Sequence, residues 1–237
     1  MKILVSIVSL IALLLVLLAG PLHKFGFIDL GSAFTGFKFG VYAGVAALVL
    51  LLLQVVLMRK TVTIGSTIMV IVFSAIAIAL PLSMLSKGKS VPPIHDISTD
   101  LVNPPKFVAI APLRAGAPNP VEYDGSETAE QQGQAYPELK TLSYPQPKAE
   151  LITAIEQAAK NLDWELVNTN ANEGLIEATD TTAWFGFKDD VVIRINDKGD
   201  ARLVDIRSKS RVGASDLGKN AERIGTFIKE LNIVLAK

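Results

Sequence analysis

Apolar residues divide the chain into a hydrophobic N-terminal part and a mixed C-terminal part. Three apolar runs without a charged side chain come first, at Ile3–Ala19, Phe39–Met58 and Val62–Leu85. A membrane-spanning helix needs about 20 apolar residues, because each residue adds about 1.5 Å and the hydrocarbon core is about 30 Å thick. The pattern therefore predicts a membrane region over residues 1–88 with three transmembrane helices, the first of them just long enough.

Positive charges around these runs predict their orientation. Lys2 before the first run also fits a signal peptide, but Leu17-Leu18-Ala19 is a poor cleavage site, so we expect a retained anchor. Arg59 and Lys60 fill the short loop between the second and third runs, and short basic loops face the cytoplasm. We therefore expect a multi-pass protein of the bacterial inner membrane, with a cytoplasmic N-terminus and a periplasmic C-terminal domain.

Glycines recur every four residues at the start of the second run, at Gly36, Gly40 and Gly44. On a helix they form a smooth stripe that lets another helix approach closely. We interpret the stripe as a helix-packing surface, either within the protein or between copies of it. The three runs contain no Asp, Glu, Lys, Arg or His, which argues against a proton or ion pathway through this chain alone.

Residues 89–146 form a proline-rich segment without long regular elements. It is either a flexible stalk or an extended strap laid across the following domain, and its scattered apolar side chains favour the strap. Within it, Phe107–Ile110 is predicted as a short strand and Asp124–Gln134 as an exposed loop.

Residues 147–237 show the patterns of a globular core. Apolar positions at helical spacing predict helices at Pro147–Leu162 and at Asp216–Leu235, with Ser215 as the N-cap of the second. Strands are predicted at Trp164–Asn168, Leu175–Thr181, Asp190–Asn196 and Arg202–Ser208. The order helix, antiparallel sheet, helix predicts an α+β fold in which both helices pack on one sheet face, as a two-layer sandwich.

The last predicted hairpin carries alternating charges on one face. A turn centred on Lys198-Gly199 pairs Ile193 with Val204 and Val191 with Ile206. The opposite face then holds Asp190 across from Arg207, and Arg194 diagonal to Asp205. One interpretation is an ion-pair ladder that sets the register.

The other interpretation is a groove in which Arg194, Arg207 and Arg211 hold a small anionic ligand, assisted by backbone amides after Gly213. Asp216, Asn220 and Arg223 lie on one ridge of the last predicted helix, and they would either continue this groove or cap and pair with it. The candidate ligand-binding residues are Asp190, Arg194, Asp205, Arg207, Arg211, Asp216, Asn220 and Arg223.

Few residues suit catalysis. His95 and Asp96 with Ser208 or Ser210 form a weak hydrolase candidate, because no G-x-S-x-G elbow is present. Adjacent carboxylates at Asp189 and Asp190 point to opposite faces of a strand, which disfavours a metal site. The absence of cysteine excludes thiol chemistry and zinc–cysteine sites, and no cofactor motif is found. The chain has 23 basic and 23 acidic residues, which gives no electrostatic case for nucleic acid.

Several motifs of the C-terminal part resemble the domain of unknown function 1499 family of bacteria and plants. The similar stretches are Ile94–Asp100, Asn103–Phe107, Tyr136–Leu139, Trp184–Arg194, Val204–Gly213 and Ser215–Ile224. Lys209 departs from this pattern, since a small or apolar residue is more usual there. The resemblance implies a membrane-tethered or exported domain and no defined activity. The sequence thus favours a non-enzymatic envelope protein that binds a partner protein or a small anionic ligand, with an envelope hydrolase as the alternative.

Overall fold

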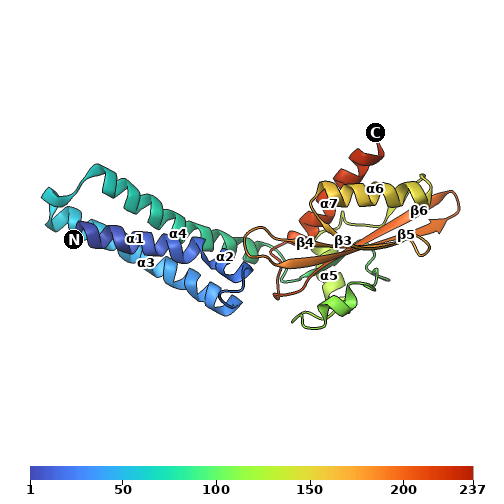
Figure 1. Cartoon of the computed structure of the whole chain (residues 1–237), viewed down its shortest axis with the longest axis horizontal. Coiled ribbons are helices and arrows are strands. Elements are labelled where there is room, and N and C mark those ends of the chain that lie inside the picture. Colours follow the sequence, from blue (N-terminus) through green and yellow to red (C-terminus); the bar gives the residue numbers. More distant parts are fainter. Residues whose placement is uncertain (237) are drawn as a thin grey trace. The chain divides into compact units, whose positions relative to one another are not determined.

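The computed structural model describes residues 1–236 and contains two compact units. The helical unit comprises Met1–Lys87 together with the short segment Ala183–Gly186. The globular unit comprises Gly88–Thr182 and the chain from Phe187 onward. Figure 1 shows the long helices of the first unit and the twisted sheet of the second.

The helical unit is built from α1 (Lys2–Leu17), α2 (Ala19–Lys24), α3 (Leu30–Leu57), the 3₁₀ helix η1 (Arg59–Thr61) and α4 (Ile64–Ser90). Among residues 1–236, α3 and α4 are long and apolar enough to cross a membrane, whereas α1 is a shorter apolar helix of 16 residues. α3 begins well before the predicted Phe39, because the Asp29 carboxylate caps it by accepting the Ser32 amide at 2.9 Å.

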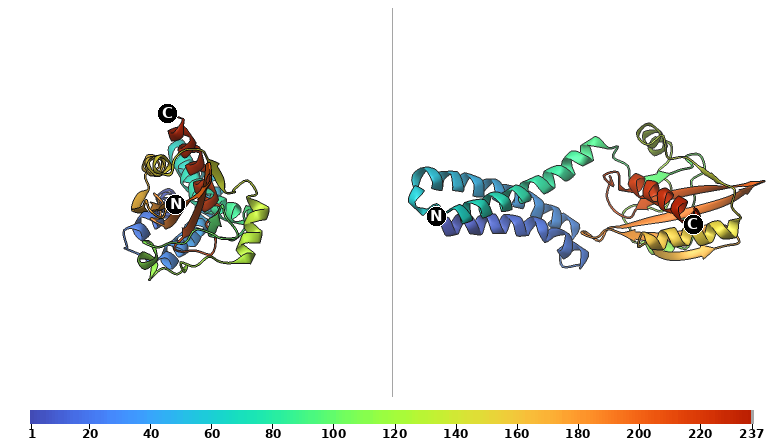
Figure 2. Two further views of the ribbon diagram at one scale, coloured as in Figure 1. Left: turned by 90° about the vertical axis from the view of Figure 1, so that its right-hand side faces the viewer. Right: turned by 90° about the horizontal axis from the view of Figure 1, so that it is seen from above.

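The glycine stripe of α3 lies against two neighbouring helices of this unit. A Cβ atom at Gly40 would lie 3.1 Å from the Ala12 carbonyl oxygen of α1, and one at Gly44 would lie 3.3 Å from the Ser74 carbonyl oxygen of α4. These glycines therefore permit close helix approach inside the unit. Figure 2 shows α1 and α3 lying side by side, with α4 crossing beside them and then diverging.

The segment Ala183–Gly186 adds aromatic side chains to the helical unit. Phe185 is buried and stacks on Phe34, and the Trp184 ring lies 5.6 Å from the Phe37 ring. The Trp184 indole nitrogen also donates to the Leu17 carbonyl oxygen at 3.2 Å. The two aromatic residues therefore form part of the packing at the end of α1 and the beginning of α3.

The globular unit is an α+β fold around an antiparallel sheet of six strands, as described over residues 1–236, and this class was predicted correctly. The strands are β1 (Asp96–Ser98), β2 (Leu142–Tyr144), β3 (Glu165–Asn170), β4 (Leu175–Thr181), β5 (Lys188–Lys198) and β6 (Ala201–Ser210). Their order is β1-β6-β5-β4-β3, and β2 also pairs with β6. The helices are α5 (Ser126–Ala135), α6 (Lys148–Asn161) and α7 (Lys219–Leu235).

The main core lies between α6, α7 and one face of the sheet (Figure 1). Alternate strand residues such as Ile193 and Ile206 meet helix residues such as Ile155 and Phe227, and all four are fully buried. Trp164 stacks on Phe227 within this core at 5.1 Å between ring centroids. Burial of these side chains is the dominant force that holds the helices on the sheet.

The predicted hairpin register is wrong by two residues, although its faces are right. Ile193 pairs with Ile206, and Arg194 pairs directly with Asp205 rather than diagonally. Lys198 pairs with Ala201, so Gly199 and Asp200 form a two-residue turn, with Gly199 at φ +60°. Moving the turn centre by one residue moves each cross-strand partner by two, so Asp190 lies opposite Lys209 instead of Arg207.

Residues 99–124 form a strap that packs on the second face of the sheet. Phe107 and Ile110 are buried there against Leu175 and Val192. The predicted strand at Phe107–Ile110 is absent from the structure. Instead the backbone bends so that the amides of residues 108, 109 and 110 all donate to the Glu177 carboxylate, at 2.8, 2.7 and 3.1 Å. A strand directs successive amides to opposite sides, so it cannot make this contact.

The predicted exposed loop at Asp124–Gln134 is also wrong, because Ser126–Ala135 forms α5. Gln132 of this helix is fully buried. Its side chain accepts the Ser98 amide at 2.9 Å and donates to the Ser98 carbonyl oxygen at 2.6 Å. This pairing with β1 holds a helix that has little apolar surface of its own.

Candidate functional site

Asp190 of β5 is a fully buried carboxylate on the strap face of the sheet. Arg211 donates two hydrogen bonds to its two carboxylate oxygens, each at 2.8 Å. Arg114 of the strap donates a third at 2.6 Å, and the Thr179 hydroxyl donates a fourth at 2.7 Å. The carboxylate therefore has four donors. Sequence reasoning missed Arg114, which lies in a segment without periodic signal.

Arg207 lies on the same face and is also buried. It donates to both oxygens of Asp96 at 2.8 Å, and to the strap carbonyl oxygens of Pro105 and Val121 at 3.2 and 3.0 Å. Its guanidinium lies over the Phe107 ring at 4.9 Å. The strap thus binds a predicted ligand-binding arginine through backbone oxygens and an aromatic face.

Lys209 continues this chain of charges. Its ammonium lies 3.2 Å from Asp96 and 2.7 Å from Asp124. Asp124 in turn lies 3.2 Å from the His95 imidazole. Burial, together with the nearby Asp96 carboxylate, raises the pKa of Tyr123 to about 12. Asp124 of the strap thus links the buried Lys209 to His95.

Arg194 is the third arginine predicted to hold an anion. It donates to Asp205 of β6 at 2.8 Å and to Asp100 of the strap at 2.9 Å. Asp205 also accepts from the Thr141 hydroxyl at 2.6 Å. Each of the three predicted anion-binding arginines is thus paired with a carboxylate of the chain itself. This geometry agrees with the ion-pair interpretation, but the pairs are mostly buried rather than an exposed ladder.

A second polar cluster lies on the helix side of the sheet. Arg223 of α7 donates to Asp189 at 2.6 Å and to Asp180 at 2.8 Å. Asp189 therefore faces α7 while Asp190 faces the strap, as strand alternation predicts. Asn220 accepts from the Ser208 hydroxyl at 2.6 Å and donates to the Ser210 hydroxyl at 3.0 Å.

Asp216 caps the start of α7. Its carboxylate accepts the amides of Gly218 and Asn220, each at 2.7 Å, and burial raises its pKa. The predicted N-cap Ser215 is wrong, because α7 begins only at Lys219 after Gly218 in the left-handed conformation at φ +78°. The amides that a bound anion was expected to use are thus taken by Asp216.

The side chains of the predicted hydrolase residues do not form a catalytic pair, although the Ser210 amide donates to the His95 carbonyl oxygen at 3.0 Å. Ser208 is fully buried, and its hydroxyl contacts Asn220 and Arg223 rather than a histidine. The His95 ring contacts Asp124 and the Ala214 carbonyl oxygen, at 3.2 and 3.4 Å. Asp96 is engaged by Arg207 and Lys209. The arrangement does not supply a nucleophile with an adjacent base.

A small polar pocket of about 180 Å³ opens beside the first turns of α7. Asp180, Lys219, Glu222 and Arg223 supply charged groups, and Thr226 supplies a hydroxyl. Leu162 and Trp164 form an apolar wall. Lys219 and Glu222 form an exposed ion pair at 2.8 Å. Of the predicted ligand-binding residues, Arg223 lines this pocket.

Comparison with known proteins adds a family without an assigned activity. Residues 96–231 match the family described as "Protein of unknown function (DUF1499)". No curated protein matches the chain. The match spans most of the globular unit, from β1 into α7.

Proposed function

Because the chain belongs to the DUF1499 family, whose description assigns no activity, we propose a function from the geometry alone. The protein is a multi-pass membrane protein whose globular unit is a non-catalytic binding domain on the extracytoplasmic side. The pocket beside α7 takes a small zwitterionic ligand that carries an ammonium and a carboxylate. The observation that carries this proposal is the pocket itself, where both signs of charge meet an apolar wall.

The membrane part of the proposal rests on helix length and on charge. α3 and α4 cross the bilayer, and α1 crosses as a third helix. Its 16 residues span about 24 Å, and local thinning of the bilayer accommodates a short helix of this kind. Arg59 and Lys60 of η1 mark the cytoplasmic loop between α3 and α4. After three crossings the globular unit lies in the periplasm of a bacterium.

Binding is favoured over catalysis because the buried ionisable groups of the sheet are already paired. Asp190, Arg207 and Arg223 each contact at least one group of opposite charge inside the fold. A general acid or base must exchange its proton with a substrate, and paired buried groups of this kind do not meet one. The pocket beside α7 keeps accessible charges instead.

The charges of the pocket favour a zwitterion over a simple anion. Arg223 is shared between Asp180 and Asp189, so its positive charge is already balanced. Lys219 and Glu222 are about half exposed, with side-chain exposures of 51% and 55%. A ligand that places its carboxylate at Lys219 and its ammonium at Glu222 replaces this exposed pair, which contributes about 0–1 kcal/mol.

Calorimetric titration of the full-length protein in detergent with L-alanine tests this assignment. We expect Glu222→Gln and Lys219→Ala each to weaken alanine binding by about tenfold or more, because each removes one half of the charge match. Lys229→Ala, on an exposed part of the same helix, serves as the control and should leave the affinity unchanged.

Titrations with acetate and with ethylamine separate the ligand classes. If acetate binds as tightly as alanine, the ammonium group contributes nothing, and the site binds a simple anion of the kind that the sequence suggested. If neither alanine, acetate nor ethylamine binds, the pocket is not a ligand site and the proposal fails.

A further inference from the structure

The tip of the β4–β5 hairpin belongs to the helical unit, although both strands belong to the globular unit. The chain leaves the globular unit at Thr182, contributes Ala183–Gly186 to the helical unit and returns at Phe187. The Thr182 amide donates to the Phe187 carbonyl oxygen at 2.8 Å, and the Phe187 amide donates to the Thr182 hydroxyl at 2.9 Å. These two hydrogen bonds close the neck of the hairpin, so the strands reach the tip as one paired element.

α2 holds this tip through main-chain oxygens. The Lys24 ammonium donates to the Ala183 carbonyl oxygen at 3.0 Å, and the His23 imidazole lies 2.9 Å from the Phe185 carbonyl oxygen. Because both contacts use the backbone of the tip, they fix the path of the chain itself. The Phe185 ring is 3% exposed and packs on rings of α3, which adds apolar packing to the polar contacts.

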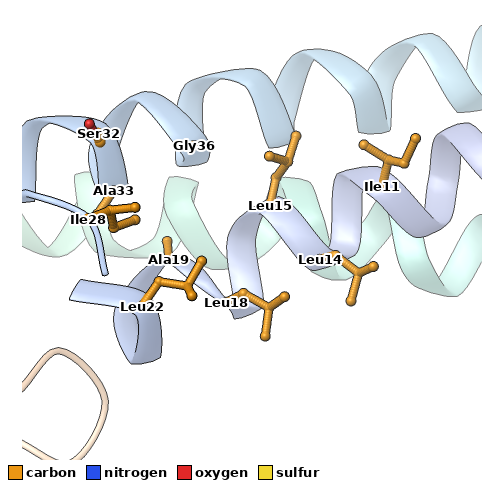
Figure 3. A pocket seen from close by; sticks show the side chains of 10 residues that line it. All are labelled: Ile11, Leu14, Leu15, Leu18, Ala19, Leu22, Ile28, Ser32, Ala33 and Gly36. Carbon is orange, nitrogen blue, oxygen red and sulfur yellow. The ribbon is translucent and has the colours of Figure 1, made fainter. Parts of the chain in front are cut away.

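α2 also borders an apolar groove of about 410 Å³, which Ala19 and Leu22 line (Figure 3). Gly20, between them, lies against Trp184, because a Cβ atom there would come within 2.5 Å of the indole ring. The missing side chain lets the tryptophan approach the backbone of this six-residue helix. α2 thus contacts the tip with one set of residues and lines the groove with another, so a movement of the tip acts first on α2.

Two carboxylates lie just beyond the neck of the hairpin, and one arginine holds both. Asp180 and Asp189 are direct cross-strand partners, two residues from Thr182 and from Phe187 respectively. Arg223 of α7 donates to Asp180 at 2.8 Å and to Asp189 at 2.6 Å. Like charges directly opposite each other destabilise a strand pair, so the guanidinium stabilises the pairing at this point.

The same ion pair forms part of the pocket beside α7, which Asp180 and Arg223 both line. The side chain of Asp180 is 28% exposed and that of Asp189 is 5% exposed, so a ligand reaches Asp180 first. The proposed zwitterion brings its ammonium to Glu222 in this pocket, where it also attracts the Asp180 carboxylate and weakens the pairing of that carboxylate with Arg223. Occupancy of the pocket therefore acts on the base of the hairpin.

We propose that the β4–β5 hairpin couples ligand binding in this pocket to the packing of α2. The ligand changes how Arg223 is shared between Asp180 and Asp189, and the neck carries this change to the tip at Ala183–Gly186. Coupling between two sites is reciprocal, so the packing of the tip also sets the affinity of the pocket. The inference rests on the proposed function, and it makes the binding domain a ligand sensor for the helical unit.

Fluorine NMR of the full-length protein in detergent, with 5-fluorotryptophan in place of tryptophan, tests the coupling. The chain has two tryptophans, and the Trp184 resonance is identified by its loss in Trp184→Phe. Trp164 lines the pocket, whereas Trp184 belongs to the helical unit, so one resonance reports the arrival of L-alanine and the other reports the tip. We expect alanine to shift both resonances with the same dissociation constant.

A substitution tests the route without a ligand. Asp180→Asn removes one of the two charges that Arg223 holds, so it should shift the Trp184 resonance of the alanine-free protein. Asp197→Asn is the matched control, because Asp197 is 59% exposed toward the other end of the same hairpin, and it should leave this resonance in place. An unmoved Trp184 resonance in Asp180→Asn, or equal shifts in the two variants, would overturn the route through Arg223.

Reciprocity gives a second test. Trp184→Ala removes the ring that lies against α2, and it should weaken alanine binding by about fivefold or more, as coupling between sites usually does. Phe39→Ala is the control, because Phe39 is a 56% exposed aromatic residue of α3, and the affinity should stay unchanged. Equal affinities of the two variants would contradict the coupling.

Failure here and failure of the proposed function are distinguishable. If alanine shifts the Trp164 resonance and leaves that of Trp184 unmoved, the pocket stands and the coupling is overturned. If alanine shifts neither resonance, the pocket assignment is wrong and the coupling falls with it.

Discussion

Asp190→Asn is expected to remove about 3–5 kcal/mol from the free energy of unfolding of the globular unit, the usual result of breaking a buried ion pair. Arg114 and Arg211 both direct their guanidinium groups at this carboxylate. Arg114 is almost fully buried and would keep its charge without an adequate counterion. The loss should therefore exceed that of the hydrogen bonds alone.

Guanidinium unfolding followed by tryptophan fluorescence measures this loss. The chain has two tryptophans, so a Trp184→Phe background leaves Trp164 in the globular core as the reporter. Asp197→Asn is the matched control on the same strand, because Asp197 is 59% exposed beside Arg202. Its cost should stay below about 1 kcal/mol. Equal effects of the two substitutions would show that Asp190 is not the centre of a buried network.

Glu177→Gln should release the strap from the sheet. The substitution replaces one carboxylate oxygen by an NH₂ group, which cannot accept the amide of residue 109. The oxygen that remains can still accept the amides of residues 108 and 110, but only as a neutral and therefore weaker acceptor. We expect a loss of about 3 kcal/mol, since hydrogen bonds to charged groups contribute about 1.5–3 kcal/mol each and relaxation recovers part of the total.

Hydrogen exchange locates this effect. The amides of residues 108–110 should exchange about a hundredfold faster in Glu177→Gln, because each 1.4 kcal/mol corresponds to a factor of ten. Glu173→Gln, in the exposed turn before β4, should leave these amides unchanged. Unchanged protection in Glu177→Gln would mean that the apolar contacts of Phe107 and Ile110 hold the strap without the carboxylate.

The sequence predicted those elements whose residues alternate or repeat with a clear period. α6 and the strands β4 to β6 follow such patterns, and the separation of Asp189 from Asp190 follows from strand alternation. The register failed because Asp197-Lys198-Gly199-Asp200 allows two turn centres one residue apart. Gly199-Asp200 is a dipeptide favoured in two-residue hairpin turns, whereas Lys198-Gly199 is not, so turn chemistry favoured the observed centre and the prediction did not use it.

Features that depend on distant partners left no local pattern. α5 is polar and contains Gly133, so its helical state depends on the pairing of Gln132 with Ser98. The bend at residues 108–110 depends on Glu177, which lies nearly 70 positions away. Arg114 carries no signal until the structure places it on Asp190. The alternating charges of β5 and β6 were recognised from the sequence, but their partners in the strap were not.

Membrane topology tests the central claim most directly, because the extracytoplasmic placement of the binding domain depends on it. The chain lacks cysteine, so single cysteines at Val102, which is 96% exposed, and at Lys60 can be labelled without background. Membrane-impermeant maleimide is applied to cells with a permeabilised outer membrane. The account predicts labelling of Val102→Cys in intact cells and of Lys60→Cys only after lysis. The reverse pattern would place the globular unit in the cytoplasm and contradict the account.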